Sequence, residues 1–505
     1  MSSSISASEE KARIRFGLTS GARRSIIAMS VAAVMAPLVY ALLVLFQLGS
    51  WNGAQWWLND ILTLRRAFYA ELLHNLPAEQ RKTIIVGGSA TLFGVDSGAI
   101  ERTTGEPTLN FGLHAGLDID LLLAQASDFI DANDRVVLPL EFDHYSRPSV
   151  TDLSAESFLA FLYPFAGAIP VSRLVPIALA TQPASAMQGV ADHLGALVTG
   201  HPAGKWRSAA ALLEDWRQIQ AAGGAAGPEH NPYDYSTMNA HGDKALILET
   251  PASDQHSVGT LITPSSAALT PYAAEALTSW KQTLANRGAG MLLTWPVIIE
   301  DDSGTIFQAG YWASLIALAR AADAIGMPLH CDPINAIVPV QYRYDTVYHT
   351  NAKGQAIYSA GLAACLPGIE TNVFDWKNAN PNEMAARAKA RIAALKQPPD
   401  PLVFGYERNI RQLGALHDAI EAEHAISGRY PAALPPFDPD VSVVEVDTAP
   451  FQPVYRSDGQ NYKLVSPGSD ECFAVSEGWP ELIDPIQTKG EACAYGYWTA
   501  GAANW

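Results

Sequence analysis

Short apolar runs alternate with helical patterns of apolar residues between residues 80 and 370. Such runs, bounded by glycine or polar residues, are typical of strands buried on both faces of a parallel sheet. We expect strands at 82–86, 108–111, 135–140 and 290–295. Apolar residues at helical spacing predict intervening helices at 119–131, 271–286 and 311–325. This alternation predicts an α/β fold, a doubly wound three-layer sandwich around a parallel sheet, with ligands beyond the carboxyl ends of the strands.

The segment from Ser25 to Leu48 is a run of 24 residues without a charged side chain. A helix of this length crosses a hydrocarbon layer of about 30 Å. Basic residues occur before the run, whereas residues 51–60 contain no Lys or Arg. The positive-inside rule therefore predicts a cytoplasmic tail (1–24), a single transmembrane anchor (25–48) in the inner membrane, and a periplasmic ectodomain. A cleaved signal peptide is the alternative interpretation.

The pattern after the anchor divides the chain into four further segments. Residues 49–80 form a connecting helix, and residues 81–370 form the α/β domain. An insertion at about 150–265 fits the alternation poorly, and its composition indicates helices and a loop over the site. Residues 371–400 contain a linker helix that ends in the breaker Gln397-Pro-Pro-Asp-Pro401, which indicates a domain boundary. Residues 401–505 follow as a small α+β unit, with a helix and a hairpin turn at Asp458-Gly459.

Composition narrows the possible partners. The chain has 505 residues, of which 48% are hydrophobic and 17% charged, so it can fill sizeable cores. Its formal charge of −18 argues against a nucleic-acid partner, because binding to phosphates draws on clustered Lys and Arg. Cys472 and Cys493 are close in the sequence and are the expected disulfide. Cys331 and Cys365 are either a second pair or two buried thiols.

A candidate nucleophile follows the first predicted strand. Ser89 comes directly after Gly87-Gly88, where glycine permits a tight turn. A helix that starts there points its backbone N–H groups at a developing oxyanion. A Gly-Gly-Ser sequence is also a common surface loop, so this motif alone does not identify a nucleophile.

A candidate acid–base pair lies about 250 residues later in the chain. Asp345 and His349 share one predicted loop, ahead of a helix at 354–366. A serine hydroxyl needs an imidazole to accept its proton, and the imidazole needs a carboxylate to orient it. An incidental Asp and His in an exposed loop is the alternative.

Together these elements resemble the SGNH (GDSL-like) hydrolase superfamily, and more closely its membrane-anchored polysaccharide O-acetylation branch, which includes the alginate O-acetylation proteins. The resemblance implies Ser89 as nucleophile, His349 as base and Asp345 as its partner. It also implies an oxyanion hole formed by the N–H groups of Ser89 and of Gly116, with Gly112 as the alternative to Gly116.

The chain departs from the family pattern in two ways. The spacing between Asp345 and His349 is one residue longer than usual, and the third block lacks the asparagine that donates to the oxyanion. His144 or Tyr145 can replace this donor, or the donor is missing and the site only binds glycan. The substrate contacts that we expect are Asn110, His144, Tyr145, Trp295 and Asn351.

The C-terminal unit resembles the globular part of a type II secretion pseudopilin or a type IV pilin. The resemblance rests on a helix that ends in Gly428-Arg-Tyr-Pro431 and on the strand-rich segment that follows. It implies docking or carbohydrate binding, since the hydrophobic pilin N-terminus is absent. His417, Glu421 and His424 share a helical spacing, but an exposed polar face explains them more simply, and we expect neither metal nor cofactor.

These expectations combine into a periplasmic enzyme that transfers acyl groups, such as acetyl, to or from an exported polysaccharide. The resemblance implies a membrane-bound O-acyltransferase or a glycan synthase complex as partner. An esterase that releases acetate is the rival enzyme. A non-catalytic scaffold or glycan-binding component of a polysaccharide secretion complex is the rival from a different class.

Overall fold

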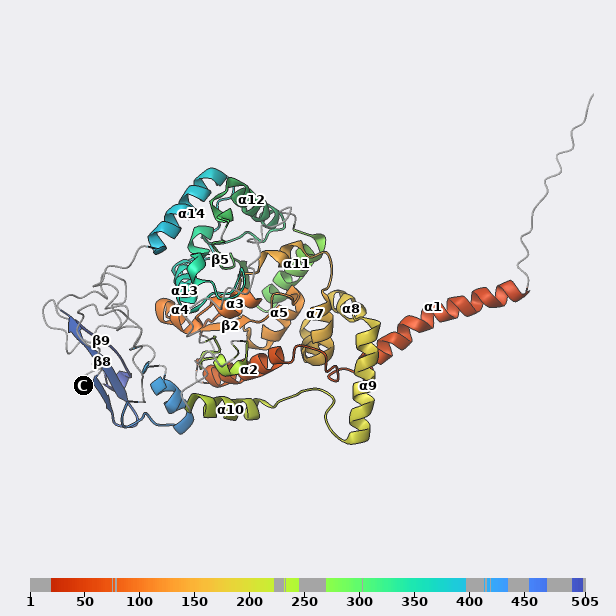
Figure 1. The fold of residues 1–505 in the computed structure, drawn as a ribbon, viewed down its shortest axis with the longest axis horizontal. Coiled ribbons are helices and arrows are strands. Elements are labelled where there is room, and N and C mark those ends of the chain that lie inside the picture. The colour runs from red at the N-terminus through yellow and green to blue at the C-terminus, as the bar shows by residue number, and fades with distance from the viewer. Residues whose placement is uncertain are drawn as a thin grey trace, which may run out of the picture.

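The centre of the α/β domain is a parallel sheet (Figure 1). The computed structural model describes residues 20–74, 76–77, 80–221, 231, 233–244, 269–301, 303–396, 413, 416–417, 419–434, 454–469 and 493–502. The order of the sheet is β2-β1-β3-β4, and each neighbouring pair is parallel. The strands are β1 (Thr83–Gly87), β2 (Thr108–Gly112), β3 (Arg135–Leu138) and β4 (Gly290–Leu293). The predicted α/β class and the parallel sheet are therefore confirmed.

The strand order reverses at β1. The chain passes from β1 to β2 on one side and then returns past β1 to β3 on the other side. Such a reversal is the switch point at which open α/β sheets bind ligands, beyond the carboxyl ends of the strands. The segments that follow Gly87 of β1 and Leu138 of β3 therefore lie at the expected ligand edge.

Helices pack around this sheet. Helix α5 packs against α11, and α13 packs against α3 and α4. Helix α14 packs along α12, so the helix expected as a linker lies against the α/β domain. These helices are α2 (Trp57–His74), α3 (Ser89–Gly94), α4 (Ser97–Thr104), α5 (Ile119–Ala126), α6 (Phe142–Ser146), α11 (Pro271–Asn286), α12 (Ala309–Ala324), α13 (Ala352–Cys365) and α14 (Pro381–Lys396).

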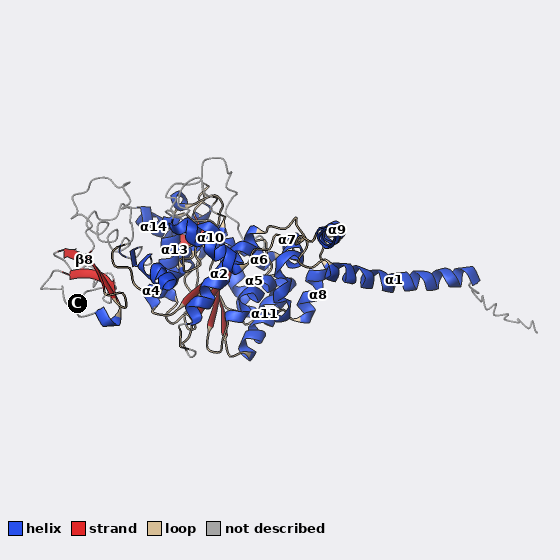
Figure 2. Cartoon of the chain, turned by 90° about the horizontal axis from the view of Figure 1, so that it is seen from below, coloured by secondary structure: helices blue, strands red, loops and turns tan. Residues whose placement is uncertain are grey.

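The N-terminal helix α1 (Ser20–Phe46) projects away from the α/β domain (Figures 1 and 2). Its segment Arg24–Phe46 is long and apolar enough to cross a membrane. Apolar side chains along it, such as Ile27, Met29 and Leu42, are exposed. An exposed apolar helix at the N-terminus is typical of an anchor or a signal sequence, and both belong to exported proteins.

The insertion contributes helices and a segment that folds back onto the domain. The helices are α7 (Asp152–Ser157), α8 (Val171–Leu179), α9 (Pro183–Thr199) and α10 (Ala209–Ala221). Residues 233–244 return to the domain, where the Asp243 carboxylate accepts hydrogen bonds from the Ser97 N–H and hydroxyl, both at 2.7 Å. Asp243 also accepts from the Asn110 amide at 2.8 Å. The rest of the insertion, residues 222–230, 232 and 245–268, lies outside the described residues.

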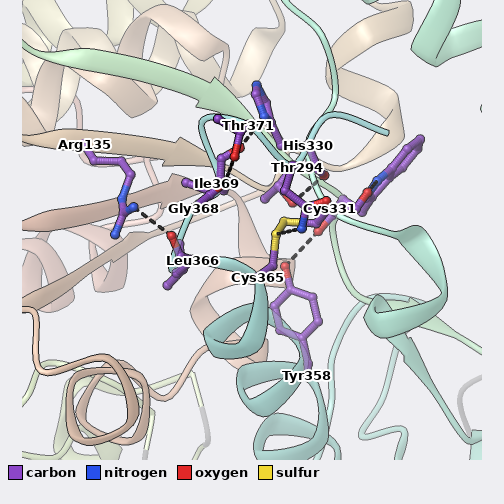
Figure 3. Close-up of a disulfide and its surroundings, with 12 residues drawn as sticks. Arg135, Thr294, His330, Cys331, Tyr358, Cys365, Leu366, Gly368, Ile369 and Thr371 are labelled. Atoms are coloured by element: carbon purple, nitrogen blue, oxygen red, sulfur yellow. Dashed lines mark hydrogen bonds between the residues drawn. A yellow bond between two sulfur atoms is a disulfide. The ribbon is translucent and has the colours of Figure 1, made fainter. Parts of the chain in front are cut away.

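A disulfide joins Cys331 to Cys365 at the end of α13 (Figure 3). Hydrogen bonds hold the surrounding segments together, among them Arg135 Nη1 to the Leu366 carbonyl at 2.8 Å and Tyr358 Oη to the Trp295 carbonyl at 2.9 Å. Of the two interpretations of this cysteine pair, the structure has the disulfide. Cys472 lies outside the described residues, so the pairing of Cys472 with Cys493 stays a prediction.

The C-terminal unit contains an antiparallel sheet in the order β7-β8-β9. Its strands are β7 (Val454–Ser457), β8 (Tyr462–Ser469) and β9 (Cys493–Trp498). The predicted hairpin turn is confirmed, because Asp458 and Gly459 lie between β7 and β8 and the Asp458 N–H donates to the Asn461 carbonyl at 3.1 Å. Gly459 has a φ of +87°, which glycine adopts without strain.

Candidate active site

Ser89 is the first residue of α3, directly beyond the carboxyl end of β1. The two preceding glycines are needed for close packing. A Cβ at Gly87 would lie 2.1 Å from the Thr91 hydroxyl, and one at Gly88 would lie 2.6 Å from the Ala115 Cα. Ser89 as a residue is 8% exposed. Its hydroxyl makes no hydrogen bond to another described residue.

A buried carboxylate fixes the turn before Ser89. Glu141 follows β3, and its oxygens accept the N–H groups of Gly88 at 3.1 Å and Ala90 at 2.7 Å. Burial raises the pKa of Glu141, while these backbone hydrogen bonds act to lower it. Glu141 stands in the segment where the family pattern has its asparagine. Its side chain occupies the backbone donors on either side of Ser89, and the sequence contained no signal for this contact.

Asp345 and His349 form the predicted pair. His349 Nδ1 lies 2.7 Å from Asp345 Oδ1. A hydrogen bond of 2.8 Å from the Tyr344 N–H to the His349 carbonyl closes the loop, so residues four apart meet. The contact fixes the imidazole through Nδ1 and leaves Nε2 as the atom that can accept a proton.

The loop of His349 is attached to the helix of Ser89. The His349 ring stacks on Phe93 with centroids 4.2 Å apart and an interplanar angle of 15°. The Thr350 hydroxyl donates to the Phe93 carbonyl at 2.8 Å. Ser89 and Phe93 are four residues apart in α3, so their side chains share one face of the helix. The fold thus brings the imidazole to the helix face that carries Ser89, although no hydrogen bond joins the two side chains among the described residues.

Tyr233 is a member of the site that the sequence analysis missed. Its hydroxyl donates to Asp345 Oδ2 at 2.5 Å and lies 3.2 Å from His349 Nδ1. Burial and the neighbouring Asp345 carboxylate raise the pKa of Tyr233, so the phenol stays a neutral donor. Tyr233 lies in the insertion, where no periodic pattern indicated which side chain would return to the domain.

His114 is a second missed residue. Its Nδ1 accepts the Gly116 N–H at 2.8 Å, so the proton of the neutral ring is on Nε2. Burial, followed by repulsion from the charges of His349 and Arg147, lowers the pKa of His114 to about 4. The ring is therefore neutral at physiological pH and carries an N–H donor. His114 lies near His349, and the Trp57 ring packs edge-on against it with centroids 6.1 Å apart.

Both glycines predicted for the oxyanion hole have acceptors within the chain. The Gly116 N–H donates to His114, and the Gly112 N–H donates to Asn110 Oδ1 at 2.8 Å. Donation by either N–H to an oxyanion would require that hydrogen bond to be exchanged. Ser89 is the one residue of the predicted oxyanion set whose backbone N–H shows no acceptor among the described residues.

The residues predicted to bind substrate have structural roles in this arrangement. Asn110, His144, Tyr145 and Trp295 are buried in the domain. His144 Nε2 lies 3.0 Å from the Leu117 carbonyl, and burial lowers its pKa to about 3. Trp295 Nε1 donates to the Cys331 carbonyl at 2.9 Å, and Asn351 Oδ1 accepts the Gly354 N–H at the start of α13. The side chains that surround His349 are instead Phe93 and Tyr233, with Trp57 in contact with Tyr233.

No metal site is present among the described residues. Of the three helix residues considered as ligands, His417 stacks on Tyr497 with ring centroids 4.3 Å apart, and His424 stacks on Tyr430 at 4.0 Å. The Tyr430 hydroxyl donates to the Glu421 carboxylate at 3.4 Å. These side chains pack within the C-terminal unit.

The chain matches no protein-family model, no curated protein sequence and no solved structure. The chemistry open to the site therefore follows from its own groups. A serine hydroxyl on one face of a helix, an imidazole fixed by a carboxylate beside that face, and a neutral imidazole N–H nearby are the components of acyl transfer through a serine nucleophile.

Proposed function

We propose that this chain is an SGNH-like enzyme, anchored in the inner membrane by α1, that transfers acyl groups such as acetyl to or from an exported polysaccharide. The observation that carries the proposal is the Asp345–His349 pair, whose imidazole stacks on Phe93, the residue one helical turn after Ser89 in α3. The glycine turn before Ser89, at the switch point of the sheet, supports it. We extend the proposal to the three-layer architecture of that superfamily, and to a pilin-like role of the C-terminal unit in docking or glycan binding.

The reaction has two steps. His349 Nε2 accepts the proton of the Ser89 hydroxyl as the oxygen attacks the acyl carbonyl, and a tetrahedral oxyanion forms. The oxyanion collapses to an acyl-serine, and the leaving oxygen takes the proton from His349. A sugar hydroxyl or water then attacks the acyl-serine and gives its proton to His349. The second tetrahedral intermediate breaks its bond to the Ser89 oxygen, which takes the proton back from His349, so the acylated sugar or free acid leaves and both residues are restored. Asp345 orients the ring and stabilises the imidazolium through Nδ1.

His114 supplies the donor that the family pattern assigns to an asparagine. Its neutral ring carries a proton on Nε2, because Nδ1 accepts the Gly116 N–H. A donor that is already oriented by the protein stabilises an oxyanion without reorganisation. The Ser89 N–H is the second donor.

Tyr233 is a positioning residue. It donates to the Asp345 oxygen that does not contact His349, so the carboxylate is held from both sides. These two contacts keep the loop of His349 in one orientation. Because Tyr233 belongs to the insertion, its contact with Asp345 also attaches the insertion to the site.

A transferase and an esterase differ only in the acceptor that attacks the acyl-serine. We favour the transferase, with a membrane-bound O-acyltransferase or a glycan synthase complex as partner, because the family resemblance implies such a complex.

A scaffold or glycan-binding component is the second candidate. Two observations favour it: Glu141 occupies the backbone donors on either side of Ser89, and the described residues contain no hydrogen bond between Ser89 and His349. Catalytic hydrogen bonds are often long in unliganded proteins and tighten with substrate, so the second observation is also consistent with catalysis.

The deciding experiment uses the purified full-length chain in detergent with a soluble acetyl ester. We expect mass spectrometry to find an acetyl group on Ser89, and Ser89→Ala to abolish acetylation and turnover. Ser314→Ala, in α12, is the matched control and should leave both unchanged. An oligosaccharide acceptor then distinguishes the enzymes, because acetylated sugar indicates a transferase and free acetate alone an esterase. If Ser89→Ala turns over the ester as the native chain does, the proposed mechanism is wrong.

A further inference from the structure

Helices α8 and α9 of the insertion expose a set of apolar side chains that no other part of the described chain covers. We call it the α8–α9 surface. Its α8 members are four residues apart, so they form one side of that helix. Its members are Val171, Val175, Leu179, Met187, Leu194, Leu197 and Val198. Their exposed fractions run from 49% for Val175 to 87% for Val198, which is unusual for a group of large apolar residues so close in the sequence.

These helices lie against the C-terminal part of α1. The Tyr40 hydroxyl donates to the Thr181 carbonyl in the turn between α8 and α9 at 2.5 Å. Further along, Val44 packs with Ala186, and the Phe46 ring contacts His193 with centroids 4.4 Å apart. The turn is thus level with Tyr40, six residues before α1 ends at Phe46. At a rise of about 1.5 Å per residue, this is about 9 Å inside the end of the apolar helix.

The orientation of α9 fits an element that lies in a membrane surface. In Figure 1 α9 runs across the direction of α1, and in Figure 2 it is seen end-on beside the base of α1. Interfacial helices lie in the plane of the membrane, with their apolar side about 5–10 Å below the headgroup boundary. The position of the α8–α9 turn relative to α1 agrees with that depth.

The charged residues of this segment are used within the chain. Between residues 171 and 199 the ionisable side chains are Arg173, Asp192 and His193. Arg173 is paired with Asp120 at 2.8 Å. Asp192 accepts the Asn52 N–H at 3.3 Å, and His193 Nδ1 lies 2.9 Å from the Ser50 hydroxyl, just after α1. The exposed residues of the segment are therefore uncharged; they include the apolar side chains of the α8–α9 surface and the polar Ser172, Gln182, Gln188 and Thr199. The segment has no lysine or unpaired arginine that would select anionic lipids.

We propose that the α8–α9 surface inserts into the outer leaflet of the same membrane that α1 spans, with lipid acyl chains as its partner. The inference rests on the part of the proposed function that makes α1 an anchor, and is independent of acyl transfer. Two attachments, one spanning helix and one interfacial pair of helices, fix the height and tilt of the α/β domain above the membrane. A single spanning helix would leave the domain free to tilt.

The test measures depth in the membrane with the full-length chain. The protein is reconstituted into phosphatidylcholine vesicles whose acyl chains carry bromine, a contact quencher of fluorescence. A fluorescent amino acid replaces Leu179 or Leu197 in the α8–α9 surface, Val31 in α1, or Val373, an exposed valine of the α/β domain. We expect bromolipid to quench the label at Val31, Leu179 and Leu197, each at least about twofold more than at Val373. Partial replacement by phosphatidylglycerol should leave these ratios unchanged.

Three results would overturn the proposal. Equal quenching at Leu179, Leu197 and Val373 means that the surface stays in water. Protection of Leu179 from both bromolipid and aqueous iodide means that a second copy of the chain covers it. Absence of quenching at Val31 means that α1 does not span the membrane, and the proposed insertion of the α8–α9 surface is then wrong as well. Loss of acyl transfer, by contrast, changes none of these readings, because no labelled residue belongs to the site.

Discussion

The two halves of the candidate site are held in different ways. The turn before Ser89 is fixed inside the α/β domain by glycines and by the buried Glu141 carboxylate. His349, the proposed base, is fixed by Asp345, and Asp345 in turn by Tyr233, which the insertion contributes. The position of Ser89 therefore depends on the core of the domain, whereas the position of His349 depends on how the insertion is placed. Substitutions on the two halves should differ accordingly, those at the turn acting on stability and those at the base acting on rate.

The largest effect is expected from loss of the base. His349→Ala removes the proposed proton acceptor of Ser89 and should lower kcat/KM for a soluble ester by about a thousandfold or more. The free energy of unfolding should change by far less than the activation free energy of ester turnover does. His201→Ala, at an exposed position of the insertion, is the control. Ester turnover by His349→Ala within tenfold of the native rate would contradict the assignment of the base.

Glu141→Ala should act mainly on stability. It leaves the buried N–H groups of Gly88 and Ala90 without acceptors, at a cost of about 1–3 kcal/mol for each. We expect denaturant unfolding to show a loss of about 3 kcal/mol, and a smaller loss for Glu141→Gln, which keeps one acceptor. Glu214→Ala, on the exposed face of α10, is the control. A stable Glu141→Ala protein would mean that the turn before Ser89 needs no carboxylate.

His114→Phe separates donation to the oxyanion from packing. The phenyl ring keeps the contact with Trp57 but lacks the Nε2–H, so kcat should fall by about a hundredfold. His114→Gln keeps a donor and an acceptor and should recover much of this loss. Equal rates for the two variants would show that His114 does not stabilise the oxyanion.

Tyr233→Phe should lower kcat by about tenfold, because it removes one hydrogen bond that orients Asp345. KM should stay unchanged, since Tyr233 contacts the base and its partner. Tyr235→Phe is the matched control, because the Tyr235 hydroxyl contacts Asp215 and Arg207 instead. A change in KM alone would assign Tyr233 to substrate binding.

A smaller effect concerns pH. The pKa of His114 is about 4 in the folded chain, below its ordinary value of 6.5. Between these two pH values the unfolded chain therefore binds the His114 proton more tightly than the folded chain does. The stability that the neutral His114 ring contributes is complete above pH 6.5 and is lost as the pH falls towards 4. With allowance for its remaining exposure to solvent we expect about 1 kcal/mol. Unfolding curves of His114→Phe should lack this part of the pH dependence. An identical pH dependence in the native chain and in His114→Phe would contradict the contribution of His114.

Much of the fold was predictable from local pattern. The helix expected at 271–286 is α11, and the four expected strands form the sheet. The third strand was expected to run to Leu140, but β3 ends at Leu138. Pro139 has no N–H to donate to the neighbouring strand, which explains the earlier end. The contact between Asp345 and His349 was predictable for a similar reason, because these residues are four apart in the chain.

The rest of the site was not predictable, because its contacts join distant segments. Tyr233 reaches Asp345 across 112 residues, and Glu141 reaches Ala90 across 51. His114 was part of a recognised block, but only the contact with Gly116 reveals its tautomer. Which N–H groups face the proposed oxyanion depends on how the segments that carry Ser89, His114 and His349 pack together.

The sequence by itself determined the parallel-sheet class, the apolar N-terminal helix, the turn before Ser89 and the loop that pairs Asp345 with His349. Each depends on apolar spacing, on glycine or on residues close in the chain, whose physics is local. Only the tertiary structure decided that Cys331 bonds Cys365, that Glu141 accepts the N–H groups beside Ser89, and that Tyr233 donates to Asp345. These contacts form because packing the apolar faces of the sheet and helices brings together side chains whose own pattern carries no information about their partners.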